Sequence, residues 1–340
     1  MGPGATGSGD EQPPQPTVAA IDAYMAAAVE REGLKGAAVI IGRVDRRGGF
    51  QNLVRGYYGS YGPETVEPVA SITKGISTAV VASLVDEGKL SFDDPISRRL
   101  PGVPAAKAGI TIRQAMSHLS GIPAQPITLE SGHADLQQAA TQALGLPLRG
   151  EPGKVFVYSG SAMQVGGRAA EIAGGEDFRT LFQKRIAGPL NMSRTRYSAF
   201  SHGRGSPALG GDLVSTPADL ERFTQMMAAR GLWGGRRVLS EAVIADMARL
   251  IGQQAAPLAV PRMAQRFPGM GTGFWCERVA ADGRCLSIAA IGAFGGYIWV
   301  DYERSLYGVM FVKDEPIKIL KHWRAVRAAA ERIPMQAGSR

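Results

Sequence analysis

Strand-like segments occur at both ends of this 340-residue chain, while the long middle of the chain lacks them. Strands joined by short turns pair antiparallel, because a parallel pair needs a connection of about a dozen residues or more. Helical periodicity at 18–32 and from Pro316 onward flanks these segments on the outside. The predicted strands are 36–44 ("GAAVIIGRV"), 50–59, 271–280, 284–290, 295–301 and 305–313.

The middle of the chain consists of helical patterns interrupted by Gly and Pro. This order predicts an α+β fold: one antiparallel sheet built from both chain termini, flanked by the N- and C-terminal helices, plus an inserted mainly helical domain. We expect the sheet domain to comprise 17–88 and 251–335 and the helical domain 89–250, with a site in the crevice between them. Residues 1–16 lack the basic and apolar regions of a signal peptide and are typical of a disordered leader.

The composition argues against several classes of function. The net charge is +8, but the basic residues gather only in the last helix ("KILKHWRAVRAAAER"), which favours a solvated helix face over a nucleic-acid patch. No run approaches the roughly 18 apolar residues of a membrane span. The four histidines lie far apart and the two cysteines fit no metal-ligand spacing, so neither a metal nor another cofactor is expected.

Two further sequence motifs are also excluded. The chain contains no GxSxG, which argues against a Ser-His-Asp hydrolase of the α/β type. A formal GxGxxG from Gly2 to Gly7 follows no strand pattern and opens no helix, so it does not indicate a dinucleotide site.

The stretch "EPVASITKG" places Ser71 and Lys74 three residues apart in small and apolar company. The following pattern predicts a helix from Ser71 to Asp86 that stops at Gly88. Lys74 then lies one turn from Ser71 on the same helix face, and a desolvated lysine can act as a base for a serine nucleophile. A lone S-x-x-K occurs by chance about once in such a chain. However, the neighbouring "AVVASLV" indicates a buried helix, and a lysine is rarely buried without a partner or a function.

Two more segments contain candidate site residues. Tyr158 ends a short extended run ("GKVFVY") before another helix, and it is either a core tyrosine or a proton relay next to Ser71. The glycine-rich "AAIGAFGGYIWV" runs into a strand, and glycines in such a pattern mark the close approach of a ligand or another backbone. This strand could offer a second N–H group to an oxyanion.

The three segments together resemble the serine β-lactamase and penicillin-binding-protein superfamily, especially its class C branch with the family VIII carboxylesterases and nylon-oligomer hydrolases. The first motif of that superfamily is complete at Ser71-Ile72-Thr73-Lys74. The second, Tyr-x-Asn, keeps only its tyrosine at Tyr158-Ser159-Gly160, and the third, Lys-Thr-Gly or His-x-Gly, keeps only its glycine at Ala290-Ile291-Gly292. The resemblance covers about residues 18–333.

The resemblance implies a role for each matched residue. Ser71 would be the nucleophile, Lys74 its base and Tyr158 the relay to the leaving group. The N–H groups of Ser71 and Ala293 would form the oxyanion hole. Substrate contacts would come from Gly160, Gly292 and Phe294.

The departures from the family pattern bear on the substrate. The missing cation at Ala290 and the missing amide at Gly160 remove polar anchors for a carboxylate-bearing acylamino substrate. We therefore expect a serine hydrolase that forms an acyl-enzyme on Ser71 and acts as a carboxylesterase on small esters. The alternatives are a D-amino-acid peptidase or amidase, a weak β-lactamase, and a binding or sensor protein that keeps the fold. The expected partner is a small-molecule ester or amide, and the sequence leaves both compartment and oligomeric state open.

The two cysteines flank a predicted hairpin turn ("ERVAADGR"). Cys276 and Cys285 could therefore face each other across adjacent strands. A disulfide would require an oxidising compartment, so both the bridged and the free form stay open.

Overall fold

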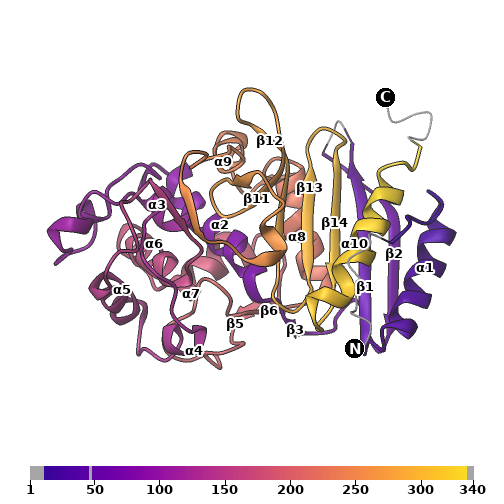
Figure 1. Ribbon diagram of the computed structural model, residues 1–340, viewed down its shortest axis with the longest axis horizontal. Helices are drawn as coiled ribbons and strands as arrows, with labels where there is room; N and C mark the ends of the chain where they lie inside the picture. The colour runs from indigo at the N-terminus through magenta and orange to yellow at the C-terminus, as the bar shows by residue number, and fades with distance from the viewer. Residues whose placement is uncertain (1–10, 46–47, 335–340) are drawn as a thin grey trace, which may run out of the picture.

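The structure is a computed structural model that describes residues 11–45 and 48–334. Figure 1 shows a strand-rich part on one side and a mainly helical part on the other. The central feature is a seven-stranded sheet in the order β10-β11-β12-β13-β14-β1-β2, in which all neighbours are antiparallel. Its strands are β1 Gly36–Val44, β2 Phe50–Gly59, β10 Gly269–Met270, β11 Trp275–Val279, β12 Cys285–Ile291, β13 Tyr297–Asp301 and β14 Leu306–Phe311.

The predicted α+β fold is confirmed, because strands from both ends of the chain form this one sheet. The join is the pairing of β1 with β14, where Ala38 lies opposite Phe311 and Ile40 opposite Val309. Almost every residue of β1 is buried, since its two faces are both covered. This explains why its sequence is a nearly continuous apolar run.

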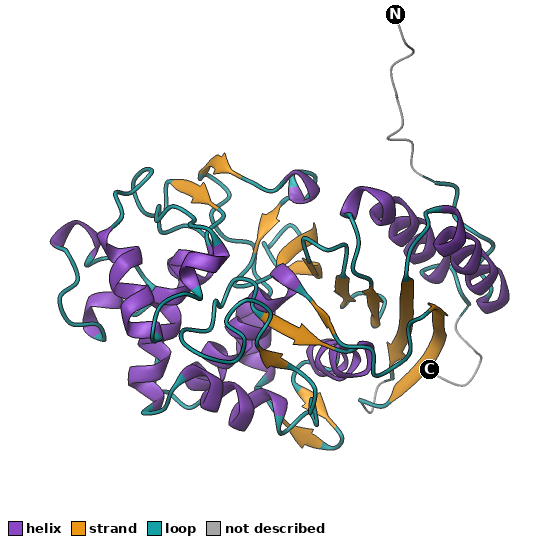
Figure 2. Cartoon of the chain, turned by 90° about the horizontal axis from the view of Figure 1, so that it is seen from below, coloured by secondary structure: helices purple, strands orange, loops and turns teal. Residues whose placement is uncertain are grey.

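Helices cover both faces of the sheet. Helices α1 (Val18–Arg31) and α10 (Pro316–Ala330) pack together on one face, and α8 (Pro217–Ala228) packs against β13, β14 and β1 on the other. Figure 2 shows the same arrangement from below, with the paired helices and α8 on opposite sides of the strands. Side chains of β1 alternate accordingly, with Val39 in the core under α1 and α10 and Ile40 in the opposite core.

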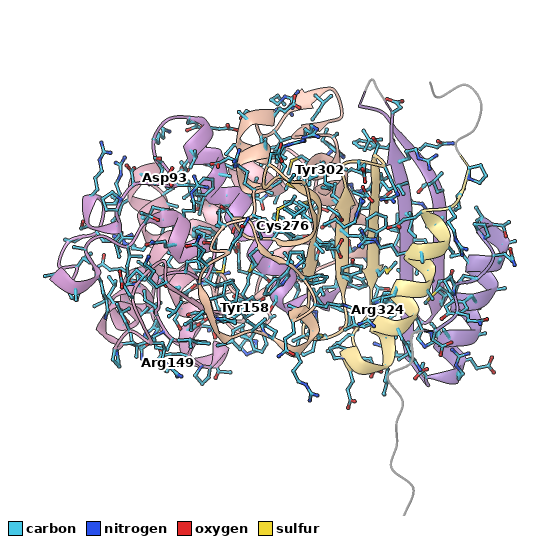
Figure 3. All side chains as sticks on the ribbon, turned by 45° about the horizontal axis from the view of Figure 1, so that its top comes forward. Asp93, Arg149, Tyr158, Cys276, Tyr302 and Arg324 are labelled. Atoms are coloured by element: carbon cyan, nitrogen blue, oxygen red, sulfur yellow. A yellow bond between two sulfur atoms is a disulfide. The ribbon has the colours of Figure 1, made fainter. Side chains whose placement is uncertain are left out.

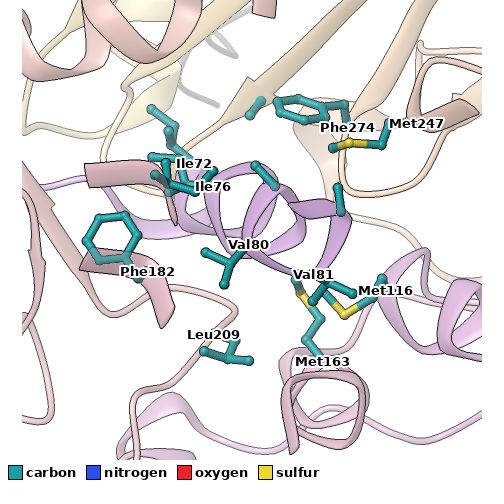
Figure 4. Close-up of a cluster of buried hydrophobic side chains, with 14 of the residues drawn as sticks. Ile72, Ile76, Val80, Val81, Met116, Met163, Phe182, Leu209, Met247 and Phe274 are labelled. Atoms are coloured by element: carbon teal, nitrogen blue, oxygen red, sulfur yellow. The ribbon is translucent and has the colours of Figure 1, made fainter. Parts of the chain in front are cut away.

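The helical part surrounds α2 (Thr73–Asp86), whose residues from Thr73 to Leu84 are all buried. Figure 4 shows its apolar side chains, such as Ile76 and Val80, among side chains from several other elements. The other helices are α3 Ile112–Met116, α4 Ile127–Glu130, α5 Leu136–Gly145, α6 Gly160–Gly174, α7 Phe178–Phe182 and α9 Glu241–Met247, with the π-helix η4 Gln183–Ala187 and the 3₁₀ turns η1 Ala70–Ile72, η2 Ile96–Arg98, η3 Ala105–Lys107 and η5 Arg262–Ala264.

The predicted start of the helix at Ser71 is wrong by two residues. The α-helix begins at Thr73, and Ser71 lies in the preceding 3₁₀ turn η1. Backbone contacts from outside the helix cause this, because the Val69 N–H donates to the Leu213 carbonyl and holds the chain before the turn. The other end agrees with the prediction, since Gly88 follows the helix with a φ of 68°.

Several short strands lie outside the main sheet, and of these only β4, within the extended run 153–158, was predicted. They form small ladders, and β4 and β9 pair in parallel. These strands are β3 Glu67–Pro68, β4 Val155–Val157, β5 Arg196–Tyr197, β6 Leu213–Ser215, β7 Leu232–Trp233, β8 Arg236–Arg237 and β9 Ala256–Ala259.

The predicted domain boundaries stay a prediction. Helix α8 lies inside the range 89–250 but packs on the sheet, so this range is not confined to the helical part. Of the predicted leader, residues 1–10 lie outside the described residues. The carboxylate of Glu11, which is described, pairs with Arg31 and Lys321.

A disulfide joins Cys276 on β11 to Cys285 on β12, with their Cα atoms 5.3 Å apart. The bridged form is therefore the one that the structure contains. No helix within residues 11–45 and 48–334 is both long enough and apolar enough to cross a membrane.

Candidate active site

Ser71 stands at a strained point of the backbone. The residue before it, Ala70, has a φ of 46°, which is the left-handed region that side chains with a Cβ atom rarely adopt. Such strain persists only where the surrounding structure imposes it, and it clusters at functional sites. The half-buried hydroxyl of Ser71 is thus presented at the entry of α2 by the fold rather than by helix propensity.

Lys74 lies one turn further along and is buried. Its Nζ donates to Ser71 Oγ at 3.2 Å and to the Gly210 carbonyl at 2.6 Å. The close approach of that carbonyl needs a glycine, because a Cβ on Gly210 would lie 3.3 Å from Nζ and 2.9 Å from the Cα of Gly160. The predicted pairing of the serine hydroxyl with the lysine amine is therefore present in the geometry, while the catalytic roles of both stay predictions.

Tyr158 follows β4 and places its ring beside the same amine, with Nζ of Lys74 4.5 Å from the ring centroid. The ring is held between His118, at 4.4 Å between centroids, and Trp275, which stacks nearly parallel at 5.6 Å. In Figure 3, Tyr158 lies in the middle of the molecule, between the helical part and the strands. The structure thus brings Tyr158 to Lys74, whose amine contacts Ser71, and the role of Tyr158 as a proton relay stays a prediction.

The glycine-rich turn after β12 approaches the other side of Ser71. A Cβ on Gly292 would lie 2.5 Å from the Val69 carbonyl, so only glycine allows this contact. The turn is closed by the Gly292 N–H, which donates to the Gly296 carbonyl at 2.8 Å, and Ala293 at its tip is exposed. Phe294 is half-buried next to it.

The predicted oxyanion donors are the N–H groups of Ser71 and Ala293, and this role stays a prediction. Within the described part of the chain, no backbone hydrogen bond holds the N–H of Ser71 or of Ala293. Both groups are therefore available to a ligand atom, as an oxyanion hole requires.

Sequence reasoning missed His118, which touches the site from behind Tyr158. Its buried Nδ1 accepts a hydrogen bond from the Ser159 N–H at 3.1 Å, while Nε2 has no partner among the described residues. Burial, together with the charge of Lys74, holds the pKa of His118 well below its usual value, so the ring is neutral. The single histidine in "AMSHLSG" carries no spacing that would identify it.

Sequence reasoning also missed Glu130, the last residue of α4. Its buried carboxyl accepts a hydrogen bond from Ser161 Oγ at 2.8 Å and lies against Gly160. Burial raises the pKa of Glu130 to about 7, although the Ser161 hydrogen bond and the charge of Lys74 act in the opposite direction. The loop sequence around Glu130 gives no signal of this, because the contact joins segments about thirty residues apart.

The described residues contain no group of three or more His, Cys, Asp or Glu side chains that could hold a metal ion. Around the Ser71 hydroxyl the structure places the Lys74 amine, which in turn lies over the ring of Tyr158.

The sequence pattern of the Beta-lactamase family matches residues 21–331, and the chain therefore belongs to this family of serine hydrolases. Among characterised relatives, the chain is 25% identical over 269 residues to the D-alanyl-D-alanine-carboxypeptidase/endopeptidase AmpH of Escherichia coli (strain K12). That alignment covers 69% of this chain and 66% of AmpH. The chain thus spans about two thirds or less of the length of the first curated relatives that it matches.

Solved structures show the same fold. A protein from Bacteroides dorei DSM 17855, provisionally assigned as a β-lactamase, superposes with a TM-score of 0.81 at 29% identity, covering 92% of this chain and 98% of that one. EstCE1, a hydrolase with promiscuous acyltransferase activity, superposes with a TM-score of 0.73 at 18% identity, covering 92% of this chain and 97% of that one. At that identity EstCE1 is evidence for the fold alone.

Proposed function

We propose that this protein forms an acyl-enzyme on Ser71 and hydrolyses small carboxylic esters. The observation that supports this most strongly is the buried Lys74 amine 3.2 Å from Ser71 Oγ. A serine hydroxyl is a weak nucleophile until a neighbouring group accepts its proton, and a desolvated amine can do so when it is neutral.

In the proposed reaction, Lys74 accepts the proton of Ser71 as Oγ attacks the acyl carbon of the ester. The N–H groups of Ser71 and Ala293 stabilise the oxyanion. Tyr158 donates its proton to the departing alkoxide and takes up the proton held by Lys74, so that both groups return to their starting states. Water then attacks the acyl-enzyme, with a proton passing back to Ser71 Oγ, and releases the acid. Loss of one oxyanion donor would cost about 3 kcal/mol at the transition state.

Two features favour esters over penicillins. Ala290 is a small buried residue on β12, so it offers no cation to a substrate carboxylate. The carboxyl of Glu130 fills the space that a side chain at Gly160 would take, and when ionised it can only accept hydrogen bonds. A missing charge-assisted hydrogen bond costs about 1.5–3 kcal/mol, which is about tenfold to a hundredfold in affinity.

The activities named for similar proteins do not single out the ester. AmpH is described as a D-alanyl-D-alanine carboxypeptidase and endopeptidase, which supports the peptidase alternative. The substrate test must therefore separate an ester, a β-lactam and a D-alanyl-D-alanine peptide.

The test is kcat/KM for p-nitrophenyl acetate, nitrocefin and a D-alanyl-D-alanine peptide on one preparation, with Ser71→Ala as the control. The ester should be the best substrate by at least about tenfold, and Ser71→Ala should abolish its turnover. Faster hydrolysis of nitrocefin or of the peptide would replace the esterase assignment. Absence of Ser71-dependent turnover on all three would favour a binding or sensor protein.

A further inference from the structure

Glu130 is one of the few carboxylates buried in the helical part, and it lies directly behind the site. It ends the short helix α4 and is only 4% exposed. Its Oε1 accepts the hydrogen bond of Ser161 Oγ, and Ser161 Oγ in turn accepts from the Gln125 N–H at 3.0 Å. The loop and the first turn of α6 are thereby fixed so that the carboxyl group points to Gly160.

Gly160 and Gly210 lie between this carboxyl and the amine of Lys74. A Cβ on Gly160 would lie 2.6 Å from Oε2 of Glu130 and 2.8 Å from Oε1, so any larger residue at 160 would collide with the carboxyl. Gly210 lies against Gly160 on one side and against Lys74 Nζ on the other. The carboxyl and the amine are thus separated by the backbone of these two glycines, and Lys74 Nζ also donates to the Gly210 carbonyl at 2.6 Å.

Three segments bring titratable groups to the surroundings of Lys74. Burial raises the pKa of Glu130 on α4 against the effect of the Lys74 charge, whereas burial and that charge together lower the pKa of His118 after α3 and keep it neutral. Tyr158, which precedes α6, presents the face of its ring to the amine. Among these groups, Glu130 is the one that can place a negative charge near Lys74 at neutral pH.

We propose that Glu130 is a positioning residue whose charge sets the pH at which Lys74 becomes a competent base. This inference rests on the proposed role of Lys74 in acylation. An ionised Glu130 stabilises the ammonium form of Lys74 and so delays the loss of its proton to higher pH. A protonated Glu130 exerts no such effect, because it carries no charge.

The burial of Glu130 determines the pH range in which its charge changes. Its raised pKa, about 7, means that the carboxyl changes charge close to neutral pH, where an ordinary glutamate would stay ionised. A small fall in pH therefore changes the charge that Lys74 experiences.

The test is the pH profile of kcat/KM for p-nitrophenyl acetate in the wild type and in Glu130→Gln. Glutamine keeps the size of the side chain and removes the charge, so Lys74 should lose its proton at lower pH. The acid limb should move down by about one pH unit, while the plateau at high pH changes less than about threefold. An acid limb that stays in place in folded Glu130→Gln contradicts the proposal.

Two other variants provide a second test of the proposal and a control. Ser161→Ala removes the hydrogen bond that favours the carboxylate, so it should move the limb in the same direction by a smaller amount, and a move to higher pH would contradict the proposal. This variant serves if Glu130→Gln does not fold. The matched control is Glu171→Gln, which removes the charge of another buried glutamate, on α6, that pairs with Arg168. The acid limb of the pH profile should stay in place in this variant.

The inference and the proposed function fail in different ways. Wild-type protein without Ser71-dependent ester hydrolysis would contradict the proposed function itself. Wild-type protein with that activity, and with the same acid limb in all variants, would contradict only the role of Glu130. As an independent readout, the rate of Ser71 labelling by a fluorophosphonate should show the same displacement with pH.

Discussion

Two buried polar clusters in this protein differ in how completely their groups are paired. Under α10, the Arg327 guanidinium donates to Glu277, to Tyr297, to Ser287 at 3.0 Å and to Glu331 at 2.9 Å. Ser287 also donates to Glu277 at 2.7 Å, and the guanidinium lies 4.3 Å from the ring centroid of Trp299. These contacts raise the pKa of Arg327 and keep it charged.

The cluster at Ser71 is less complete. Lys74 donates to one carbonyl and to the Ser71 hydroxyl, while His118 Nε2 and the N–H groups of Ser71 and Ala293 have no partner in the part of the chain that the structure describes. The buried Nε2 of His118 costs free energy because it has no partner among the described residues, so folding stability does not favour this part of the arrangement. The comparison suggests that the first cluster holds the sheet and α10 together, whereas the second is kept for chemistry.

The largest effect is expected for Lys74→Met. Removal of the proposed base should lower kcat/KM for the ester by about 10,000-fold, since general-base catalysis contributes up to that factor. The free energy of unfolding should fall by only about 1 kcal/mol, because the Gly210 carbonyl is left without its donor. Ester assays and urea unfolding check the two parts.

Lys107 provides a matched control for that variant. It is also a buried lysine, but its Nζ donates to the carbonyls of Leu144 and Leu146 at the C-terminal end of α5. Lys107→Met should therefore lose stability and keep ester turnover within about threefold. Equal loss of activity in both variants would mean that a buried lysine matters here only for folding.

Arg327→Met should have the opposite signature to Lys74→Met. Removal of one member of a buried, fully paired cluster typically costs about 3–5 kcal/mol, because the remaining charge of Glu277 is left without its partner. The ester kcat of the folded fraction should stay near the wild-type value. The exposed Arg332, just after α10, supplies the control, and Arg332→Met should unfold at the wild-type urea concentration.

Reduction of the disulfide should also act on stability rather than on chemistry. Cys276 and Cys285 close a loop with a sequence separation of 9 residues, for which chain entropy predicts a contribution of about 2–3 kcal/mol. Thermal unfolding with and without reductant measures it, with the Cys276→Ala/Cys285→Ala variant as reference. A reduced protein that keeps its melting temperature but loses ester turnover would contradict this expectation, because it would show that the disulfide between β11 and β12 supports catalysis.

Tyr158→Phe should give the smallest change. The phenyl ring keeps the contacts with His118, Trp275 and Lys74, so the loss reports the hydroxyl alone. We expect about a tenfold lower kcat with little change in stability, measured by steady-state and pre-steady-state ester hydrolysis. Unchanged kinetics would return Tyr158 to the role of a core residue.

The sequence predicted most of the sheet, but it did not predict the buried residues that surround Ser71 and Lys74. The strands 36–44 and 50–59 agree with β1 and β2, because short apolar runs separated by a glycine turn depend on local chemistry. The start of α2 could not be predicted, since the Val69–Leu213 hydrogen bond sets it from a distant segment. Glu130 was missed for the same reason, because only the folded chain brings it to Gly160.

Lys107 shows a further limit of sequence reasoning. The argument that a buried lysine indicates chemistry holds for Lys74 only in combination with the nearby hydroxyl. At Lys107 the same property has a structural cause, because burial lowers the pKa of its amine while two carbonyls accept its hydrogen bonds.

The most direct test of the account is the identity of the atom that carries the acyl group. The protein is mixed with a p-nitrophenyl ester, quenched in acid within the first turnovers, digested and mapped by mass spectrometry, with Ser71→Ala treated in parallel. We predict an acyl adduct on Ser71 in the wild type, and none in Ser71→Ala. An adduct on another residue, or ester turnover that continues in Ser71→Ala without any adduct, would contradict the assignment of Ser71 as the nucleophile.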